Sequence, residues 1–289
     1  MKLTRETVWI AGASGRMGRA LVNALKKNVE YKVIGTDMDV DVTDRHAVHQ
    51  AVEMYRPTII INCASISDDA YCEAHEIEAY KVNVLGARNL AMASRHLNAR
   101  IIELSTDDVF DGKKDGGFTE FDATEPVSVY GKTKVAAENF VRELNPRHLI
   151  VRSSWVYGIG SNDFLSHVLT KGKKGETIEA RCDYISSPTS ASELAKFIQI
   201  LMEQSEYGIY HASAEGACSR YEFAKAILEG MGMDTSLVVP VKAEEQGSKS
   251  TLLKNMMMKM TDIYTMPAWQ EELQAYLENL KLENLEATK

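Results

Sequence analysis

The chain has few cysteines and no long apolar run, and each scarcity excludes a class of protein. Four cysteines in 289 residues are too few for a disulfide framework, and none forms a C-x-x-C pair. No stretch of about 18 apolar residues occurs, which argues against a membrane span. The N-terminal segment also lacks the apolar core of a signal peptide. We therefore expect a cytoplasmic protein with reduced thiols and no membrane partner.

Clustered basic charge is missing as well. The sequence has 33 Lys and Arg against 41 Asp and Glu, which gives a formal net charge of −8. Its short basic clusters, at 113–114 and 171–174, lie beside glycine and acidic residues and are typical of solvated loops. Because a phosphate backbone demands clustered Lys and Arg, we expect no nucleic-acid partner.

Short apolar runs alternate with helical patterns through the first half of a chain whose composition is that of a folded globular protein. Strands are predicted over residues 7–11, 32–35, 57–62, 100–105, 148–152 and 208–211. Helices are predicted around residues 16–26, 48–55, 79–97, 131–144 and 192–203. Because parallel crossovers need a helix, this alternation predicts an α/β fold: a Rossmann-type, doubly wound parallel sheet with helices on both faces.

After Gly158 the pattern changes to shorter elements, glycine pairs and a methionine-rich stretch at 256–260. The methionines are typical of a flexible core or lid rather than of a cofactor site. The change of pattern predicts a second, smaller and discontinuous domain. The first domain would comprise residues 1–158 plus about 187–214, and the second about 159–186 plus 215–289.

A glycine-rich turn, Gly12-Ala13-Ser14-Gly15-Arg16-Met17-Gly18, joins the first predicted strand to the first predicted helix. Glycines allow a tight turn and close backbone approach, and the helix N-terminus then faces a pyrophosphate. The spacing is G-x-x-G-x-x-G, so a turn without a ligand is the alternative. Asp37 follows the second strand, where a carboxylate can accept hydrogen bonds from an adenosine ribose or simply cap a turn.

Tyr130 and Lys134 lie four residues apart and share one face of a predicted helix. A nearby ammonium lowers the pKa of a phenol, which would make Tyr130 a usable proton donor. Tyr221 and Lys225 repeat the spacing, so the spacing alone is weak evidence. Tyr130 follows a strand that ends at the hydroxyl of Thr106, at the edge where ligands bind in open α/β folds. We therefore expect Tyr130 to be functional and Tyr221 to be a packing residue.

These motifs, with Asn62-Cys63-Ala64, Asn83-Val84-Leu85-Gly86 and Ser105-Thr106-Asp107, resemble the extended short-chain dehydrogenase/reductases. More narrowly, the chain resembles the dTDP-4-dehydrorhamnose reductase family over about residues 7–230. The segments that carry this narrower resemblance are 41–44, 105–112, 130–134, 154–158, 187–189 and 208–211.

The resemblance implies a mechanism and a set of site residues. Thr106 would orient the sugar carbonyl, Tyr130 would donate the proton, and Lys134 would bind the nicotinamide ribose and tune Tyr130. Hydride would pass from NAD(H) or NADP(H) to the C4 ketone of a 4-keto-6-deoxy nucleotide sugar, giving dTDP-L-rhamnose, in a possible homodimer. The implied cofactor contacts are Gly12, Ser14, Gly15, Arg16, Met17, Gly18, Asp37, Asp41, Val42, Cys63, Ala64, Ser65, Asn83, Tyr130 and Lys134. The implied substrate contacts are Ser105, Thr106, Asp107, Asp108 and Trp155, with a core aromatic as the alternative for Trp155.

Two departures from the family pattern concern the substrate. Asp108 stands where the family usually has tyrosine, and Gly247-Ser248 stand where it usually has Arg-Pro. A different cation must then contact the diphosphate, and Lys249 and Lys254 are the nearest in sequence. The departures keep two alternatives open: another nucleotide-sugar oxidoreductase or epimerase, and a regulatory subunit like the methionine adenosyltransferase β subunit.

Histidines supply no predicted metal site. His46 and His49 are three residues apart on a predicted helix, but no third ligand lies nearby in the sequence. A protein metal site usually needs three or four ligands. We therefore expect no metal.

Overall fold

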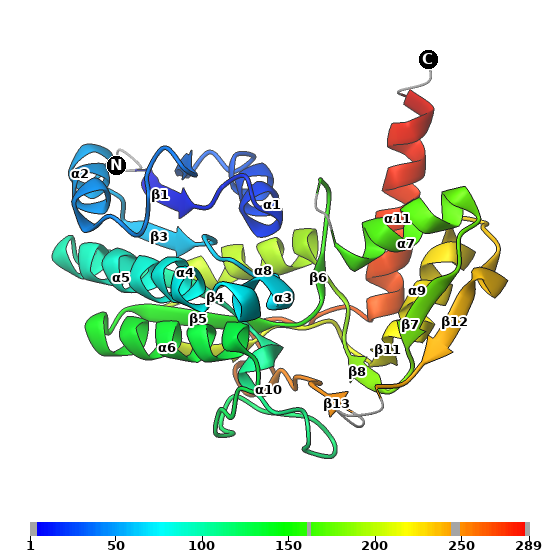
Figure 1. The fold of residues 1–289 in the computed structure, drawn as a ribbon. Helices are drawn as coiled ribbons and strands as arrows, with labels where there is room; N and C mark the ends of the chain where they lie inside the picture. The colour runs from blue at the N-terminus through cyan, green and yellow to red at the C-terminus, as the bar shows by residue number, and fades with distance from the viewer. Residues whose placement is uncertain (1–4, 161–162, 244–248, 287–289) are drawn as a thin grey trace.

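Six parallel strands form the central sheet of the computed structural model, which describes residues 5–160, 163–243 and 249–286 (Figure 1). They are β1 (Glu6–Ala11), β2 (Tyr31–Thr36), β3 (Ile59–Asn62), β4 (Arg100–Thr106), β5 (His148–Ser153) and β10 (Gly208–His211). Their order is β10-β5-β4-β3-β1-β2, and every neighbouring pair is parallel. The predicted doubly wound sheet is confirmed, and each predicted strand lies within two residues of its observed bounds.

Helices cover both faces of this sheet (Figure 1). They include α1 (Arg16–Leu25), α2 (Arg45–Tyr55), α5 (Gly86–His96), α6 (Val129–Leu144) and α8 (Ala191–Glu203). Alternate side chains of β1 show how the two layers form: Val8 and Ile10 pack with α1 and α8. Trp9 and Ala11 pack with α2, α5 and α6 on the other face. Because the strand is buried on both faces, it is apolar throughout rather than alternating.

A π-helical turn interrupts the helix predicted over residues 79–97. The elements in this region are α3 (Asp69–Ala74), α4 (Glu76–Tyr80) and the π turn η1 (Lys81–Leu85), from which α5 continues. Asn83 is buried in the turn, and its side chain bonds to Ile66 and Thr133. A π turn places one extra residue in a helix and is frequent at functional sites. Here it holds Asn83 against the loop that follows β3.

Shorter elements build a second core beside the sheet (Figure 1). They are β6 (Val156–Tyr157), α7 (Phe164–Lys174), β7 (Ile178–Arg181), β8 (Tyr184–Ser186), β9 (Thr189–Ser190), β11 (Cys218–Ser219), α9 (Arg220–Gly230), β12 (Val238–Val241), β13 (Lys249–Ser250) and α11 (Trp269–Glu286), with the short 3₁₀ helix η3 (Thr235–Leu237). A second 3₁₀ helix, η2 (Asp107–Val109), directly follows β4 at the edge of the central sheet. The strands form three small sheets: β11-β8-β13, β12-β7 and β6-β9. Tyr157, Phe223 and Trp269 are among the buried side chains of this core.

The methionine-rich stretch forms a short helix, α10 (Met256–Thr261), which belongs to the core of the sheet. Met258 is 1% exposed and packs in the same cluster as β1 and α8. The stretch is therefore core rather than a lid, and it departs from the expected assignment of 215–289 to the second domain. Among the described residues, every helix is too short or too polar to cross a bilayer.

Candidate active site

The glycine-rich turn lies where the strand order of the sheet reverses. The chain runs from β1 to β2 on one side and then returns to β3 on the other side of β1. Gly12 has a φ of 77°, and a Cβ there would lie 2.6 Å from the backbone nitrogen of Ala64. A Cβ on Gly18 would overlap the Gly12 carbonyl. The loops after β1 and β3 therefore approach as closely as backbones can, at the point where open α/β sheets bind their ligands.

Helix α1 begins at this turn with its N-terminus directed at the crevice. Gly15 is the N-cap, and no side chain caps the first turn. The free N–H groups and the helix dipole suit a pyrophosphate. The predicted contacts Arg16 and Met17 point elsewhere: Arg16 donates to the Val156 carbonyl and lies 3.7 Å from Asp163, and Met17 packs on the sheet core.

Asp37 directly follows β2, beside the turn. Its Oδ2 accepts hydrogen bonds from the Ser14 N–H, at 3.0 Å, and from the Ser14 hydroxyl. This places a carboxylate at the rim of the crevice, where an adenosine ribose binds in this type of fold. Asp41 is exposed and accepts from the Thr43 N–H. Val42 is buried among the side chains of the sheet core, so the structure gives its side chain no access to the crevice.

The loop after β3 carries the predicted contacts Cys63, Ala64 and Ser65. The side chain of Asn62 accepts a hydrogen bond from the Ala64 N–H at 3.1 Å. Asn83, from the π turn, accepts from the Ser65 hydroxyl at 3.1 Å. Asn83 is fully buried, so it fixes the loop rather than offering a free group to a ligand.

Thr106 and Tyr130 lie close together at the carboxyl edge of the sheet. Thr106 ends β4, and Tyr130 lies in the first turn of α6, which is capped by the Ser128 hydroxyl. The Thr106 side chain is one of the groups close enough to the Tyr130 phenol to act on its pKa. Burial raises the pKa of the Tyr130 phenol, and the carboxylates of Asp108 and Asp69 raise it further. The phenol therefore keeps its proton over the whole physiological range.

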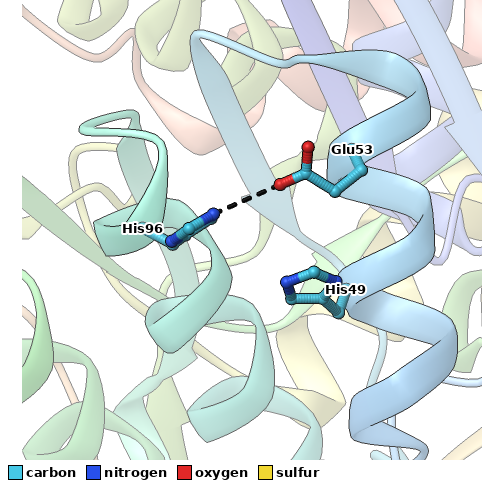
Figure 2. A group of neighbouring side chains, drawn as sticks. All are labelled: His49, Glu53 and His96. Carbon is cyan, nitrogen blue, oxygen red and sulfur yellow. Dashed lines mark hydrogen bonds and ion pairs between the residues drawn. The ribbon is translucent and has the colours of Figure 1, made fainter.

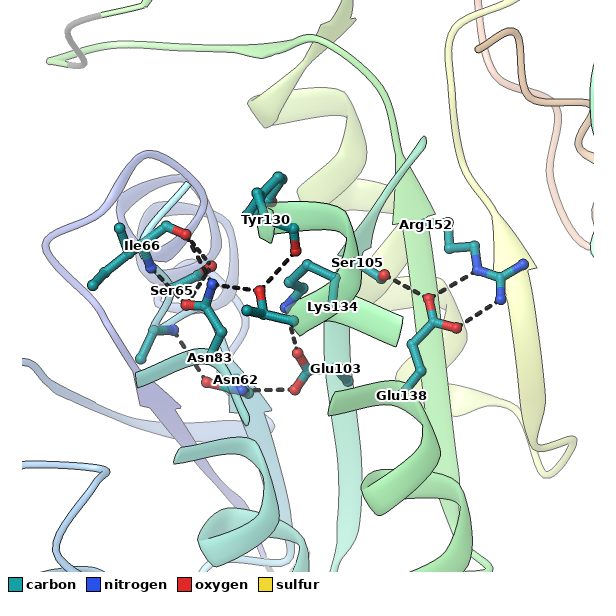
Figure 3. Close-up of polar contacts among 12 residues, drawn as sticks. Asn62, Ser65, Ile66, Asn83, Glu103, Ser105, Tyr130, Lys134, Glu138 and Arg152 are labelled. Carbon is teal, nitrogen blue, oxygen red and sulfur yellow. Dashed lines mark hydrogen bonds and ion pairs between the residues drawn. The ribbon is translucent and has the colours of Figure 1, made fainter. Parts of the chain in front are cut away.

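The pKa of Tyr130 is raised rather than lowered, so the lowering by Lys134 that the sequence predicted does not decide it. The Lys134 ammonium lies 2.6 Å from Oε1 of Glu103, and both side chains are buried, with 2% and 0% exposed (Figure 3). Oε2 of Glu103 accepts a hydrogen bond from the Asn62 amide at 2.6 Å. Sequence reasoning missed Glu103, although a single acidic residue inside an apolar strand was a visible signal.

Two further carboxylates lie next to Thr106. Asp107 is buried and accepts hydrogen bonds from Ser186 and Thr251; burial and the charge of Asp108 raise its pKa to about 7. Oδ1 of Asp108 lies 3.1 Å from the Lys249 ammonium. Of the two predicted replacement cations, Lys249 is therefore at the site, while Lys254 is exposed.

Ser105 does not join this group. Its side chain leaves β4 on the opposite side from that of Thr106, as alternation requires. The hydroxyl donates to Glu138 at 2.5 Å, and Glu138 also receives two hydrogen bonds from Arg152 (Figure 3). Ser105 thus belongs to a buried network behind the strand.

Trp155 lies between the sheet and the second core. It has a φ of 41°, which is unusual for a large side chain. The Arg220 guanidinium is 3.7 Å from the centre of its ring, and Tyr184 packs edge-on at 5.1 Å. Lys249 lies 5.0 Å from the centre of the Tyr184 ring. Sequence reasoning missed Arg220, which shares this cluster with the predicted Trp155.

Two other predicted features are not part of the cluster around Trp155. Tyr221 packs on the second core, as predicted, with the Lys225 ammonium 5.5 Å from its ring centre. Gly247 and Ser248 lie outside the described residues.

The expectation that His49 has no neighbouring ligands is wrong. His49, Glu53 and His96 come together between α2 and α5, with ligand atoms within 4.8 Å of one another (Figure 2). All three are exposed. Oε1 of Glu53 lies 3.2 Å from His96, but Oε2 lies 2.9 Å from the Arg56 guanidinium, which already offsets its charge. The absence of a metal stays a prediction.

A doubly wound sheet with an uncapped glycine turn at its switch point, and a Tyr–Lys helix beside it, defines a Rossmann-like oxidoreductase of the short-chain dehydrogenase/reductase type. Comparison with known proteins narrows this class. The chain belongs to the family described as RmlD substrate binding domain, whose model matches residues 6–282.

Relatives and solved structures agree with this assignment. The chain is 36% identical to dTDP-4-dehydrorhamnose reductase of Aggregatibacter actinomycetemcomitans, over 76% of this chain and 77% of the relative. It is 36% identical to dTDP-4-keto-6-deoxy-D-glucose reductase of Streptomyces niveus, over 81% and 82%. The crystal structure of dTDP-4-dehydrorhamnose reductase from Bacillus anthracis in complex with NADP superposes with a TM-score of 0.91. That structure is 36% identical and covers 95% of this chain and 98% of its own.

Proposed function

We propose that the protein reduces the C4 ketone of a 4-keto-6-deoxy nucleotide sugar with NADPH or NADH, converting dTDP-4-dehydrorhamnose to dTDP-L-rhamnose. The observation that carries this proposal is the placement of Thr106, at the carboxyl end of β4, beside Tyr130 in the first turn of α6. The related reductases and the NADP complex of the Bacillus anthracis enzyme support it.

The residues at the switch point fit a dinucleotide. Gly12 and Gly18 let the backbones of the turn and of the loop after β3 approach closely, and the N-terminus of α1 offers free N–H groups. Asp37 would receive the adenosine ribose hydroxyls and, by its charge, would disfavour a 2′-phosphate. When bound, the reduced nicotinamide supplies the hydride.

Tyr130 would act as the proton donor. Its raised pKa keeps the phenol protonated, and the nearby side chain of Thr106 offers a second hydroxyl group. A ketone oxygen that accepts from both is polarised before hydride arrives, and the developing alkoxide then takes the Tyr130 proton. Burial excludes water from competing for that proton.

Arg220 and Lys249 would receive the diphosphate end of the substrate. Both cations lie in the aromatic cluster around Trp155 and Tyr184. A planar guanidinium stacked on an aromatic ring still presents its N–H edges to phosphate oxygens. Lys249 would replace the arginine that the family usually carries nearby.

Mixing purified protein with the 4-keto sugar and each reduced dinucleotide tests the function. We expect the near-ultraviolet absorbance of the reduced nicotinamide to fall, and NMR of the product to show the L-rhamno configuration. Activity on dTDP-4-keto-6-deoxy-D-glucose in place of dTDP-4-dehydrorhamnose would point to a reductase named like that of Streptomyces niveus. Dinucleotide binding without any oxidation would favour the regulatory-subunit alternative.

Four finer predictions belong with this proposal. We expect the enzyme to work in the cytoplasm and to be a homodimer. We also expect it to bind no nucleic acid, and its second core to form most of a substrate-binding domain. The free cysteines support the cytoplasmic location. The mixed charge supports the prediction that no nucleic acid binds.

A further inference from the structure

The ion pair of Glu103 and Lys134 is a costly polar arrangement beside the candidate site. Neither side chain reaches solvent, and the two charged atoms lie 2.6 Å apart. Taking both charges out of water costs several kcal/mol per ion before their attraction is counted. An apolar pair of the same volume would serve stability as well, so stability alone does not account for the pair.

The pair also belongs to a continuous chain of hydrogen bonds. The Ala64 N–H donates to the Asn62 side chain at 3.1 Å, and the Asn62 amide donates to Glu103 at 2.6 Å. Lys134 completes the chain from α6 (Figure 3). Glu103 therefore connects the loop that closes over Gly12 with the helix that carries Tyr130.

We propose that Glu103 is a positioning residue: its carboxylate holds the Lys134 ammonium charged and fixed against the dinucleotide site. This inference rests on the proposed function for the role of Lys134. The sequence pattern did not indicate a role for Glu103 in the reaction. Glu103 contacts Lys134 and Asn62, so it would act through these residues and not by touching a ligand.

Other charged groups around the pair do not replace Glu103. Cys63 faces both members from the end of β3, but burial and the Glu103 charge raise the pKa of its thiol, so it stays neutral. Glu138 faces Glu103 from α6, but Arg152 neutralises it at 2.6 Å. Tyr130, one turn before Lys134, keeps its proton. Without Glu103, the ammonium would be buried with no counter-charge, which disfavours its charged form.

The test compares Glu103→Gln with Glu138→Gln as a matched control. Both carboxylates are buried and both pair with a cation at 2.6 Å; Glu103 lies in β4 and Glu138 packs against it from α6, but only Glu103 touches Lys134. We expect both variants to lose similar thermal stability. Only Glu103→Gln should weaken NADPH binding, by roughly tenfold, and shift the alkaline limb of the kcat profile to lower pH. Equal binding constants and pH profiles in the two variants would overturn the proposal.

A double-mutant cycle of Glu103→Gln and Lys134→Met tests the proposal by NADPH affinity alone. If Glu103 acts through Lys134, the losses of NADPH affinity should not add in the double variant. Fully additive losses would contradict the proposal. If Glu103→Gln does not fold, Glu103→Asp takes its place in the cycle, with the same expectation at a smaller loss. Dinucleotide binding is measured without any sugar. If the wild-type protein reduces no nucleotide sugar, the proposed function is wrong, but the effect of Glu103→Gln on NADPH affinity still tests the role of Glu103.

Discussion

The two ends of the candidate site are built differently. At the cofactor end, backbone approaches backbone: the Gly12 turn lies against the loop at Ala64, and buried amides and one ion pair fix the surroundings. At the substrate end, charged and aromatic side chains from separate segments meet, with Asp108 and Lys249 still 17% and 27% exposed. A site built from closely packed backbone suits the dinucleotide, which does not vary. A site built from side chains can be adapted to another substrate by single amino-acid substitutions.

The largest effect is expected where the two ends meet, at Tyr130. Tyr130→Phe removes the proton donor and should lower kcat by roughly 10²–10⁴-fold. Tyr221→Phe is the matched control, because it lies in the repeated Tyr-x-x-x-Lys spacing but packs on the second core. Steady-state assays of both variants check the prediction, and a dead Tyr221 variant with an active Tyr130 variant would show that the site has been misplaced.

Gly12→Ala should break the cofactor end. The added Cβ meets the Ala64 backbone at 2.6 Å in a strained conformation, so we expect dinucleotide binding to weaken by roughly 10- to 100-fold. Gly175→Ala is the control: it adds a Cβ at a φ of 67° but with nothing within 4 Å. It therefore carries the backbone strain without the steric overlap. Fluorescence titration with NADPH measures both. A Gly12 variant that binds as tightly as the Gly175 variant would refute the close approach of the two loops.

Lys249→Ala should alter the substrate end alone. Removing this cation should raise KM for the nucleotide sugar by roughly three- to tenfold, the size expected for one partly exposed charge contact. Dinucleotide affinity should stay unchanged. Lys254→Ala serves as the control because that side chain is exposed. Equal KM values for the two variants would leave Arg220 as the phosphate contact.

Asp107→Asn should produce the smallest effect, on the pH dependence of stability. The folded protein raises the pKa of Asp107 to about 7, so between about pH 4 and 7 the unfolded chain loses this proton while the folded chain keeps it. Stability should therefore fall as pH rises through this window. The asparagine variant should show a shallower slope of melting temperature against pH, but not a flat one, because burial raises the pKa of Glu272 to about 8 and adds the same trend. An unchanged slope would contradict the assignment to Asp107.

The same contrast explains how far the sequence could predict the molecule. The glycine turn and the Tyr130–Lys134 pair are short motifs whose geometry follows from one turn or one helix, so they were visible at once. Glu103 and Lys134 are 31 residues apart, and their pairing depends on how α6 packs over β4. Arg220 reaches Trp155 through the irregular second core, where no periodicity indicates which side chains meet.

The pKa of Tyr130 shows another limit of sequence reasoning. The spacing to Lys134 indicated a lowered value, but burial and three nearby carboxylates outweigh any such effect and raise it. Sequence gives the distance along a helix but not the depth of a group or the charges that other segments bring to it. Depth and neighbouring charge decide a pKa as much as one partner does.

The π turn that carries Asn83 makes this region sensitive to length as well as to composition. Deleting one residue from 81–85 would regularise the helix and rotate everything on one side of the deletion by about 100°. Asn83 would then face away from Ile66 or from Thr133, and the loop after β3 would lose its anchor. A shorter, more regular helix would thus fold readily and leave the crevice without a fixed wall, so the surplus residue is part of the site.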